Sequence, residues 1–211
     1  RPISTGDTVE MKEEGDFVLM HAKSDVSVPS VSLLIGKYVS HIVDLGGGRK
    51  LGVHGYGNIS QEMVDLQGSV VTELFKSLER LVGELPYHEI DVVEDPEDWV
   101  FFRYGRAMPG IVMVSTPMFR PFVMTPRASG QTRGGEVLLA HELAHQWFGV
   151  LVRPSSSFDN WLSESMAEYL SGLVAQDLKF DDRNVQKRKM QGWTSLYGEW
   201  DGFASWCKDW S

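Results

Sequence analysis

The sequence is short of cysteine, which occurs once in 211 residues, as Cys207. A single cysteine excludes an internal disulfide framework and a metal site built from cysteine thiolates. Any metal ion that this chain binds must therefore be held by nitrogen and oxygen atoms.

Basic residues are also in deficit, with 20 lysines and arginines against 29 aspartates and glutamates and a formal net charge of -9. Nucleic-acid binding requires a cationic surface that neutralises phosphates, and this balance does not supply one. We therefore expect no nucleic-acid partner.

Long apolar runs and a leader segment are missing as well. No stretch approaches the roughly 18 unbroken apolar residues of a membrane span, and residues 1–5 lack the pattern of a signal peptide. We expect no transmembrane segment. Because the chain begins with Arg1 and stops abruptly at Ser211, we expect it to be a piece of a longer protein.

The apolar residues that are present, 42% of the chain, suffice for a sizeable core. Strand patterns predict a first half with strands at 16–22, 31–43, 50–56, 90–94, 99–104 and 111–115. We expect one α+β domain of two lobes, with a β-rich lobe and one long helix at 1–134 and a helical lobe at 135–211.

One long amphipathic helix is predicted between the third and fourth of these strands. Its apolar stripe recurs at three- and four-residue intervals and consists of Met63, Leu66, Val70, Leu74, Leu78 and Leu81. Asn58 followed by Gln61 resembles a capping box. We expect the stripe to pack on the sheet as core rather than to bind a ligand.

Two further helices are predicted in the second half. A loop over 127–135 leads into a helix from about Glu136 that Gly149 should end. After a break at 154–157, a second helix should bury one side, marked by Leu162, Met166, Tyr169, Leu170 and Leu173.

His141, Glu142 and His145 form an H-E-x-x-H motif inside the first of these two helices. The two histidines lie about 40° apart around a helix axis and one turn apart along it, so both imidazoles can reach one ion. Glu142 is rotated about 100° from His141, beside the ion, where it can accept a proton from bound water. The alternative is an ordinary amphipathic helix with two histidines and no metal.

Glu164 is the candidate third ligand, 18 residues after His145 and in the next predicted helix. Two histidines and one glutamate leave zinc one open position for water, which is typical of catalytic rather than structural sites. We therefore expect one zinc ion per chain, with Glu142 as the general base.

Residues 141–149 read HELAHQWFG and residues 161–169 read WLSESMAEY. These segments resemble the M1 family of zinc aminopeptidases, in the gluzincin group, whose pattern is H-E-x-A-H-Q-W-F-G and, after eighteen residues, W-L-N-E-G-F-A-E-Y. The resemblance covers roughly residues 16–175. It implies a thermolysin-like zincin catalytic domain that acts on peptide or protein substrates.

The chain departs from the family in its substrate loop. M1 exopeptidases carry a G-x-M-E-N loop whose glutamate anchors the free amino terminus of the substrate. Aligned on Met108, this chain has Pro109 in place of the glutamate and Gly110 in place of the asparagine. An unpartnered buried ammonium group is costly, so strict amino-terminal specificity requires another acid. The segment either contacts substrate or forms a turn between two strands.

A second departure concerns the tyrosine that stabilises the oxyanion in the family, normally in a Y-E-K-G setting. Tyr197 is the nearest candidate, but its surroundings do not match. We expect this donor to lie after Ser211. Loss of such a donor typically lowers kcat by about a hundredfold or more.

Glu168 lies one turn after Glu164. It is either the hydrogen-bond partner of the outer nitrogen of a liganding histidine or a solvated acid on the helix surface.

An aromatic tail, Trp193, Tyr197, Trp200, Phe203, Trp206 and Trp210, recurs at three- and four-residue intervals. This short segment cannot bury so much aromatic surface by itself. We expect a carboxy-terminal helical domain of the same protein to cover it, with a dimer contact as the second alternative and a membrane surface as the third.

The sequence therefore predicts zinc-dependent peptide hydrolysis. The family resemblance favours aminopeptidase action, whereas Pro109 opposes it and leaves an endopeptidase as an alternative. A zinc-binding scaffold with little turnover is a further alternative, because the substrate loop is altered and the tyrosine is absent.

Overall fold

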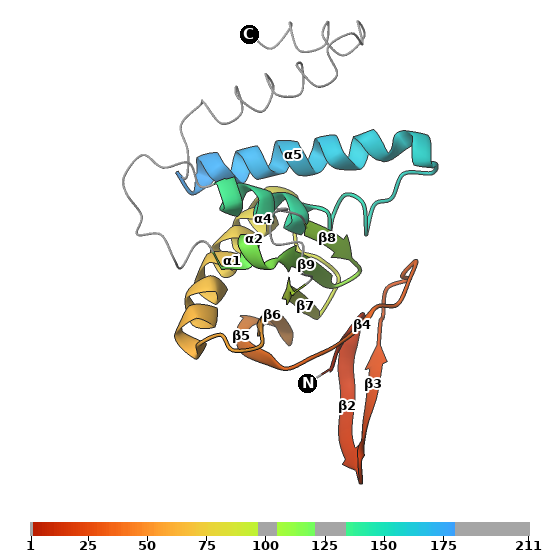
Figure 1. Cartoon of the computed structure of the whole chain (residues 1–211). Helices are drawn as coiled ribbons and strands as arrows, with labels where there is room; N and C mark the ends of the chain where they lie inside the picture. The colour runs from red at the N-terminus through yellow and green to blue at the C-terminus, as the bar shows by residue number, and fades with distance from the viewer. Residues whose placement is uncertain (1, 97–104, 121–133, 180–211) are drawn as a thin grey trace, which may run out of the picture.

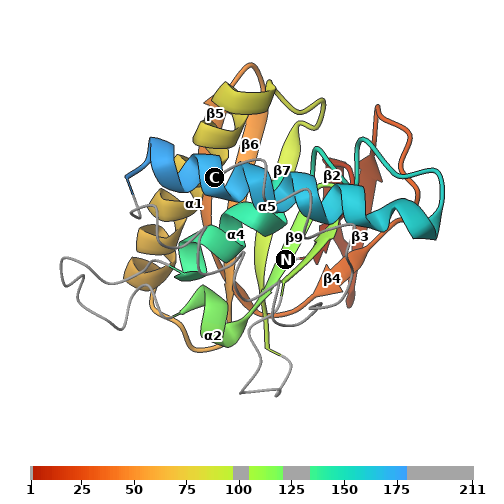
Figure 2. The same ribbon diagram turned by 90° about the horizontal axis from the view of Figure 1, so that it is seen from above.

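The computed structural model describes residues 2–96, 105–120 and 134–179. Within them, a mixed sheet lies beneath helices, with α4 (Gly134–Ala144) between the sheet and the outermost helix α5 (Asn160–Asp177), as Figures 1 and 2 show. The predicted α+β class is confirmed. The predicted division into lobes at residue 134 stays a prediction.

The sheet has five strands in the order β5-β6-β7-β9-β8. Their bounds are β5 (Tyr38–Gly46), β6 (Arg49–Tyr56), β7 (Glu89–Asp95), β8 (Gly105–Met108) and β9 (Ile111–Ser115). The three central strands run parallel, and the outer strands β5 and β8 run antiparallel to their neighbours. Strand β8 therefore forms one edge of the sheet, next to α4.

Helix α1 (Gln61–Val82) connects β6 to β7 and packs against β5 and β6. Its N-cap is Ser60, whose hydroxyl accepts a hydrogen bond from the backbone N–H of Met63 at 3.3 Å, so the predicted capping box at Asn58 is wrong. Leu66 and Leu81 of the predicted stripe are exposed. Val70, Leu74 and Leu78 of that stripe are buried as predicted, and Val64, Val71 and Phe75 complete the buried face.

The main core lies between the sheet and the helices. Leu51, Val53, Ile90, Val92, Val112 and Val114 from the sheet meet Leu74, Phe75 and Leu78 of α1 and Leu139, Ala140 and Leu143 of α4. Leu170, Val174 and Ala175 attach α5 to this core. The predicted buried side of α5 is wrong at Leu162 and Tyr169, which are exposed.

The amino-terminal part differs most from the predicted strands. The single strand expected over 31–43 is divided into β4 (Leu33–Ile35) and β5, because β4 pairs with β1 (Pro2–Ser4) instead of continuing along the sheet. Strands β2 (Asp7–Glu14) and β3 (Phe17–Lys23) form a two-stranded ribbon that extends away from the sheet (Figure 1). Strands β1, β2 and β8 were not predicted.

Two other predicted segments lie wholly or partly outside the residues that the structure describes. The strand expected at 99–104 lies outside the described residues. Of the loop expected at 127–135, only Gly134 and Gly135 are described, and both belong to α4. Short helices α2 (Thr116–Phe119) and η1 (Ser157–Asp159) complete the fold. Among the described helices, none combines the length and apolar character needed to cross a bilayer.

Candidate metal centre

His141 and His145 lie at the carboxyl end of α4. His145 follows the last residue of the helix, yet its backbone N–H still bonds to the carbonyl of His141 at 3.2 Å, which preserves the one-turn spacing. The two Nε2 atoms are 3.1 Å apart, and the ring planes are nearly perpendicular, at 89°. The two imidazoles therefore present their Nε2 atoms to one point.

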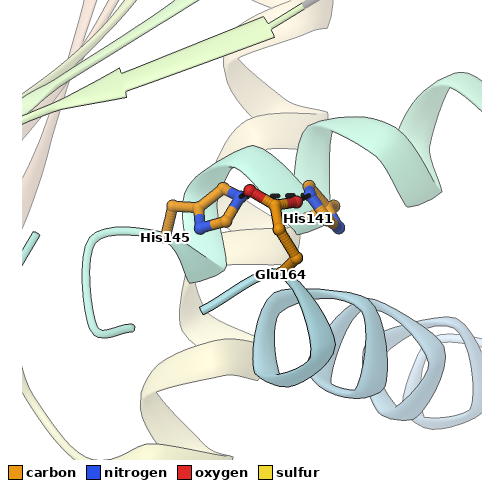
Figure 3. A group of neighbouring side chains, drawn as sticks. All are labelled: His141, His145 and Glu164. Carbon is orange, nitrogen blue, oxygen red and sulfur yellow. Dashed lines mark hydrogen bonds and ion pairs between the residues drawn. The ribbon is translucent and has the colours of Figure 1, made fainter. Parts of the chain in front are cut away.

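Glu164 reaches the same point from α5, as Figure 3 shows. One carboxylate oxygen lies 3.4 Å from Nε2 of His141, and the other lies 3.6 Å from Nε2 of His145. One atom from each of the three residues lies within 4.8 Å of the others. The structure thus brings the three predicted ligands together from two helices.

The spacing of these atoms fits a zinc site. Zinc binds histidine nitrogen and carboxylate oxygen at about 2.0–2.2 Å, so two ligands of a tetrahedral ion lie about 3.3–3.6 Å apart. The observed separations between the ligand atoms, 3.1, 3.4 and 3.6 Å, lie close to these expected distances. Two nitrogens and one oxygen also match the donor set of catalytic zinc centres.

The second nitrogen of His145 is engaged by the backbone. Its Nδ1–H donates a hydrogen bond to the carbonyl of Phe148 at 3.0 Å, which leaves the lone pair on Nε2. Burial lowers the pKa of His145 below its usual value. His145 is therefore held in the neutral tautomer that a metal ligand requires.

The second nitrogen of His141 faces Glu168. Nδ1 of His141 lies 3.3 Å from a carboxylate oxygen of Glu168, an ion-pair distance, although the two are not aligned for a regular hydrogen bond. Burial lowers the pKa of His141, but the carboxylates of Glu168, Glu142 and Glu164 outweigh that effect and raise this pKa overall. Glu168 therefore lies beside His141, while the predicted hydrogen bond between them stays a prediction.

Glu142 is buried beside these three ligands, and the residue is only 8% exposed. Burial raises the pKa of its carboxyl group to about 7. Its side chain lies against Gly105 of β8, where a Cβ atom would stand 2.3 Å from Cγ of Glu142. A side chain at position 105 would therefore force the Glu142 side chain out of this position, a constraint that the sequence alone did not reveal.

A cleft of about 930 Å³ opens over the group. His141, Glu142, His145 and Glu164 all line it, together with β8, the turn after α4 and the start of α5. Met108 also lines this cleft, whereas Pro109 and Gly110 are buried in the turn between β8 and β9. Of the three predicted substrate contacts, the structure therefore places one on the cleft wall and two in a strand turn.

Gln146 connects the metal helix to that turn, and sequence reasoning missed it. Its side chain is fully buried and donates to the carbonyls of Met108 and Ile111 at 2.9 and 3.2 Å. Its Oε1 accepts the N–H of Gly110 at 3.1 Å. A polar residue directly after the motif, in an otherwise apolar run, was the only signal in the sequence.

Two predicted features lie outside the described residues. They are Tyr197, the candidate oxyanion donor, and the aromatic tail from Trp193 to Trp210. The carboxy-terminal domain or dimer contact expected to cover the tail therefore stays a prediction.

Comparison with known proteins supplies relatives for this arrangement. Residues 107–205 match the model of the peptidase family M1 domain. The chain is 27% identical over 206 residues to leucine aminopeptidase 2 of Neurospora crassa, a match that covers 94% of this chain and 28% of the relative. Over 49 residues it is 45% identical to human endoplasmic reticulum aminopeptidase 2, which covers 21% of this chain and 5% of the relative.

Solved structures show the same fold. An M1 zinc metallopeptidase from Deinococcus radiodurans superposes with a TM-score of 0.67 at 20% identity, over 93% of this chain and 42% of that one. The fold implied by the M1 resemblance is therefore confirmed. The chain spans less than half the length of these relatives.

Proposed function

We propose that this chain, whose residues 107–205 match the model of the peptidase family M1 domain, hydrolyses peptide bonds with a zinc ion held by His141, His145 and Glu164. The observation that carries this proposal is the convergence of the three ligand atoms within 4.8 Å on the wall of a cleft. The relatives are named as aminopeptidases and a zinc metallopeptidase, which supports peptides as the substrate class.

The ion and the surrounding side chains have separate tasks. Zinc, when bound, acts as a Lewis acid that polarises a carbonyl group and lowers the pKa of water. The hydrogen bond from His145 to Phe148 and the proximity of Glu168 to His141 orient the two imidazoles. Glu164 contributes a negative charge that offsets the charge of the ion.

Glu142 is proposed as the general base. Its carboxylate takes one proton from the attacking water while the water oxygen bonds to the carbonyl carbon. The same carboxyl group then passes that proton to the leaving nitrogen as the C–N bond breaks. In the metal-free protein burial raises the pKa of this carboxyl group to about 7, which moves it towards the range in which a group can both accept and release a proton.

The cleft leaves two possibilities for the peptide bond that is cleaved, the first bond of the substrate or an internal one. Aminopeptidase action needs a carboxylate for the free amino group of the substrate. Among the described residues that line the cleft, the only carboxylates are those of Glu142 and Glu164, which already have roles. Cleavage of peptides with a blocked amino terminus is therefore the second candidate activity, favoured by the buried Pro109.

The test compares wild type with Glu142→Gln in the full-length protein that carries these residues. We expect about one zinc per chain in both proteins, and at least a hundredfold loss of hydrolysis in the variant. Substrates should include amino-acyl fluorogenic compounds and amino-blocked peptides, and Glu73→Gln on the exposed face of α1 is the matched control.

Each outcome separates the candidate functions. Full activity in Glu142→Gln would remove the assigned base. Zinc binding by a wild-type protein that cleaves neither substrate class would favour the scaffold. A chain without stoichiometric zinc would contradict the metal site itself.

A further inference from the structure

Ser40, His54 and Asp91 form a chain of hydrogen bonds across three strands of the sheet. The hydroxyl of Ser40 lies 2.8 Å from Nδ1 of His54, and Nε2 of His54 lies 2.7 Å from a carboxylate oxygen of Asp91. Ser40 on β5 and His54 on β6 are direct partners in the β5–β6 ladder. Asp91 on β7 pairs with Gly52, two residues before His54. The side chains therefore follow the order hydroxyl, imidazole and carboxylate.

These three side chains lie on the face of the sheet that is turned away from the helices. Successive side chains of a strand point to opposite faces. Val53 and Val92, which adjoin the histidine and the aspartate in the chain, belong to the core between the sheet and the helices. His41, which follows the serine, contacts α1 through a hydrogen bond of 2.8 Å. The sheet therefore separates the three side chains from the helices that carry the candidate metal centre.

The hydrogen bonds of His54 fix the direction of proton transfer. The carboxylate of Asp91 can only accept, so Nε2 of the imidazole carries the ring hydrogen. In the neutral ring, Nδ1 then keeps its lone pair and accepts the hydroxyl hydrogen of Ser40. His54 is only 1% exposed, so bulk water does not compete for either nitrogen. The imidazole is thus a base that is held against one hydroxyl and oriented by one acid.

Two neighbouring residues hold the imidazole in this position. Gly52 leaves the space that the bond between His54 and Asp91 needs, because a Cβ atom there would stand 2.1 Å from Oδ1 of the aspartate and 2.4 Å from Nε2 of the histidine. The ring of Tyr38 packs edge-on against the imidazole, with centroids 6.3 Å apart and 73° between the planes. Both contacts favour the orientation in which the ring joins Ser40 to Asp91.

Ser40 is more accessible than the buried His54. It is partly exposed, and it belongs to β5, an edge strand of the sheet. Ile42, the next residue on the same face of that strand, is 45% exposed. A small molecule can therefore reach the hydroxyl of Ser40 from solvent.

We propose that Ser40 is a nucleophile activated by His54 and Asp91, and that it takes the acyl group of small esters. Oγ of Ser40 bonds to the carbonyl carbon of the ester while its proton passes to Nδ1 of His54. The C–O bond to the leaving alcohol then breaks, and the alcohol takes that proton from the imidazole. The products are an acyl-serine, a neutral imidazole and a free alcohol. This reaction uses none of the residues proposed for peptide hydrolysis.

The probe for this reaction is an alkyl fluorophosphonate. The same serine oxygen bonds to its phosphorus while fluoride leaves with the proton, and the stable adduct records the attack. The full-length protein is used as Glu142→Gln with chelator present, which silences the candidate metal centre. Peptide mass spectrometry gives the rate of labelling at each serine. Ser69, an exposed serine of α1 whose hydroxyl donates to a backbone carbonyl, is the internal reference.

We expect labelling of Ser40 to be about a hundredfold faster than labelling of Ser69, which is the contribution of a positioned general base. Ser40→Ala should remove the first adduct and leave the second unchanged. Asp91→Asn nearly preserves the volume of the side chain but introduces a donor, so the tautomer of His54 is no longer fixed. Labelling of Ser40 should then fall by at least about tenfold.

Asp65→Asn is the matched control for the aspartate variant. Asp65 bonds to His41 at 2.8 Å on the helix side of the sheet, so this substitution also alters a pair of histidine and aspartate. It should leave the labelling rate of Ser40 unchanged. Urea unfolding of each variant, compared with the parent protein, shows that the measured rates belong to folded protein.

Two results would overturn the inference. One is labelling of Ser40 no faster than that of Ser69, a comparison that requires no substitution in the sheet. The other is fast labelling of Ser40 that persists in folded Asp91→Asn protein, because the three side chains would then serve only to join the strands.

Discussion

The side chain of Glu142 packs directly on the backbone of Gly105, so closely that a Cβ atom at position 105 would lie 2.3 Å from Cγ and 2.4 Å from Cδ of the glutamate. This contact joins the helix that carries the metal ligands to the edge strand of the sheet. Both residues line the cleft. The position of the proposed general base is thus set by the absence of a side chain on another element.

Gly105→Ala should therefore displace the carboxylate without touching the metal ligands. We expect peptide hydrolysis to fall by about tenfold to a hundredfold, because small misplacements of a reacting group are costly. Zinc content, measured by mass spectrometry, should remain at one ion per chain. The same activity in Gly105→Ala as in wild type would show that Glu142 does not act from the position seen here.

Removal of the metal should lower stability, because the proposed ligands join α4 to α5. A bound ion at a hundred times its dissociation constant stabilises the folded state by about 2.7 kcal/mol. Excess chelator should lower the Tm of wild type, measured by calorimetry. In Glu164→Ala the shift should be much smaller, whereas Glu73→Ala on the exposed face of α1 should respond as wild type does. Equal shifts in all three proteins would argue against Glu164 as a ligand.

The metal-free protein should lose stability as pH rises through the range set by Glu142. Burial raises the pKa of this carboxyl from the usual 4.5 to about 7, so the folded state holds a proton that the unfolded state has released. The free energy of unfolding should then fall between about pH 4.5 and 7 and level off above pH 7. Urea unfolding with chelator present would measure this slope.

Glu142→Gln is the matched comparison for this slope, since glutamine stays neutral at every pH. The free energy of unfolding of the variant minus that of wild type should increase from pH 4.5 to pH 7. A difference that stays constant across this interval would show that the Glu142 carboxyl is not shifted by burial.

Gln146→Met should weaken the connection between α4 and the β8–β9 turn. The substitution leaves the N–H of Gly110 and two carbonyl groups without the partner they have now, and each loss of this kind costs about 1–3 kcal/mol. We expect a lower free energy of unfolding in urea and a lower rate of hydrolysis, because β8 carries Gly105. Gln176→Met, at an exposed site on α5, should be close to neutral. Similar effects of both substitutions would show that the buried hydrogen bonds of Gln146 contribute little.

Elements with a strong periodic pattern were predicted well from the sequence. Strand β9 was placed at its observed residues because its continuous apolar run is typical of an interior strand that is buried on both faces. The fine orientation of α1 was missed. The exposed Leu66 and Leu81 fit the same three- and four-residue spacing as core residues, and only packing against the sheet selects the buried face.

The sequence by itself determined the candidate ligands, because the helical repeat brings His141 and His145 onto one side and a third ligand must come from a nearby acid. Tertiary structure alone decided three further relationships: the packing of Glu142 on Gly105, the bonds of Gln146 to the β8–β9 turn, and the hydrogen bonds of His54 to Ser40 and Asp91. The physical reason is the range of the interactions. Helical spacing is local, whereas these contacts join residues that lie 14 to 38 positions apart in the chain and approach only when the strands pair and the helices pack on the sheet.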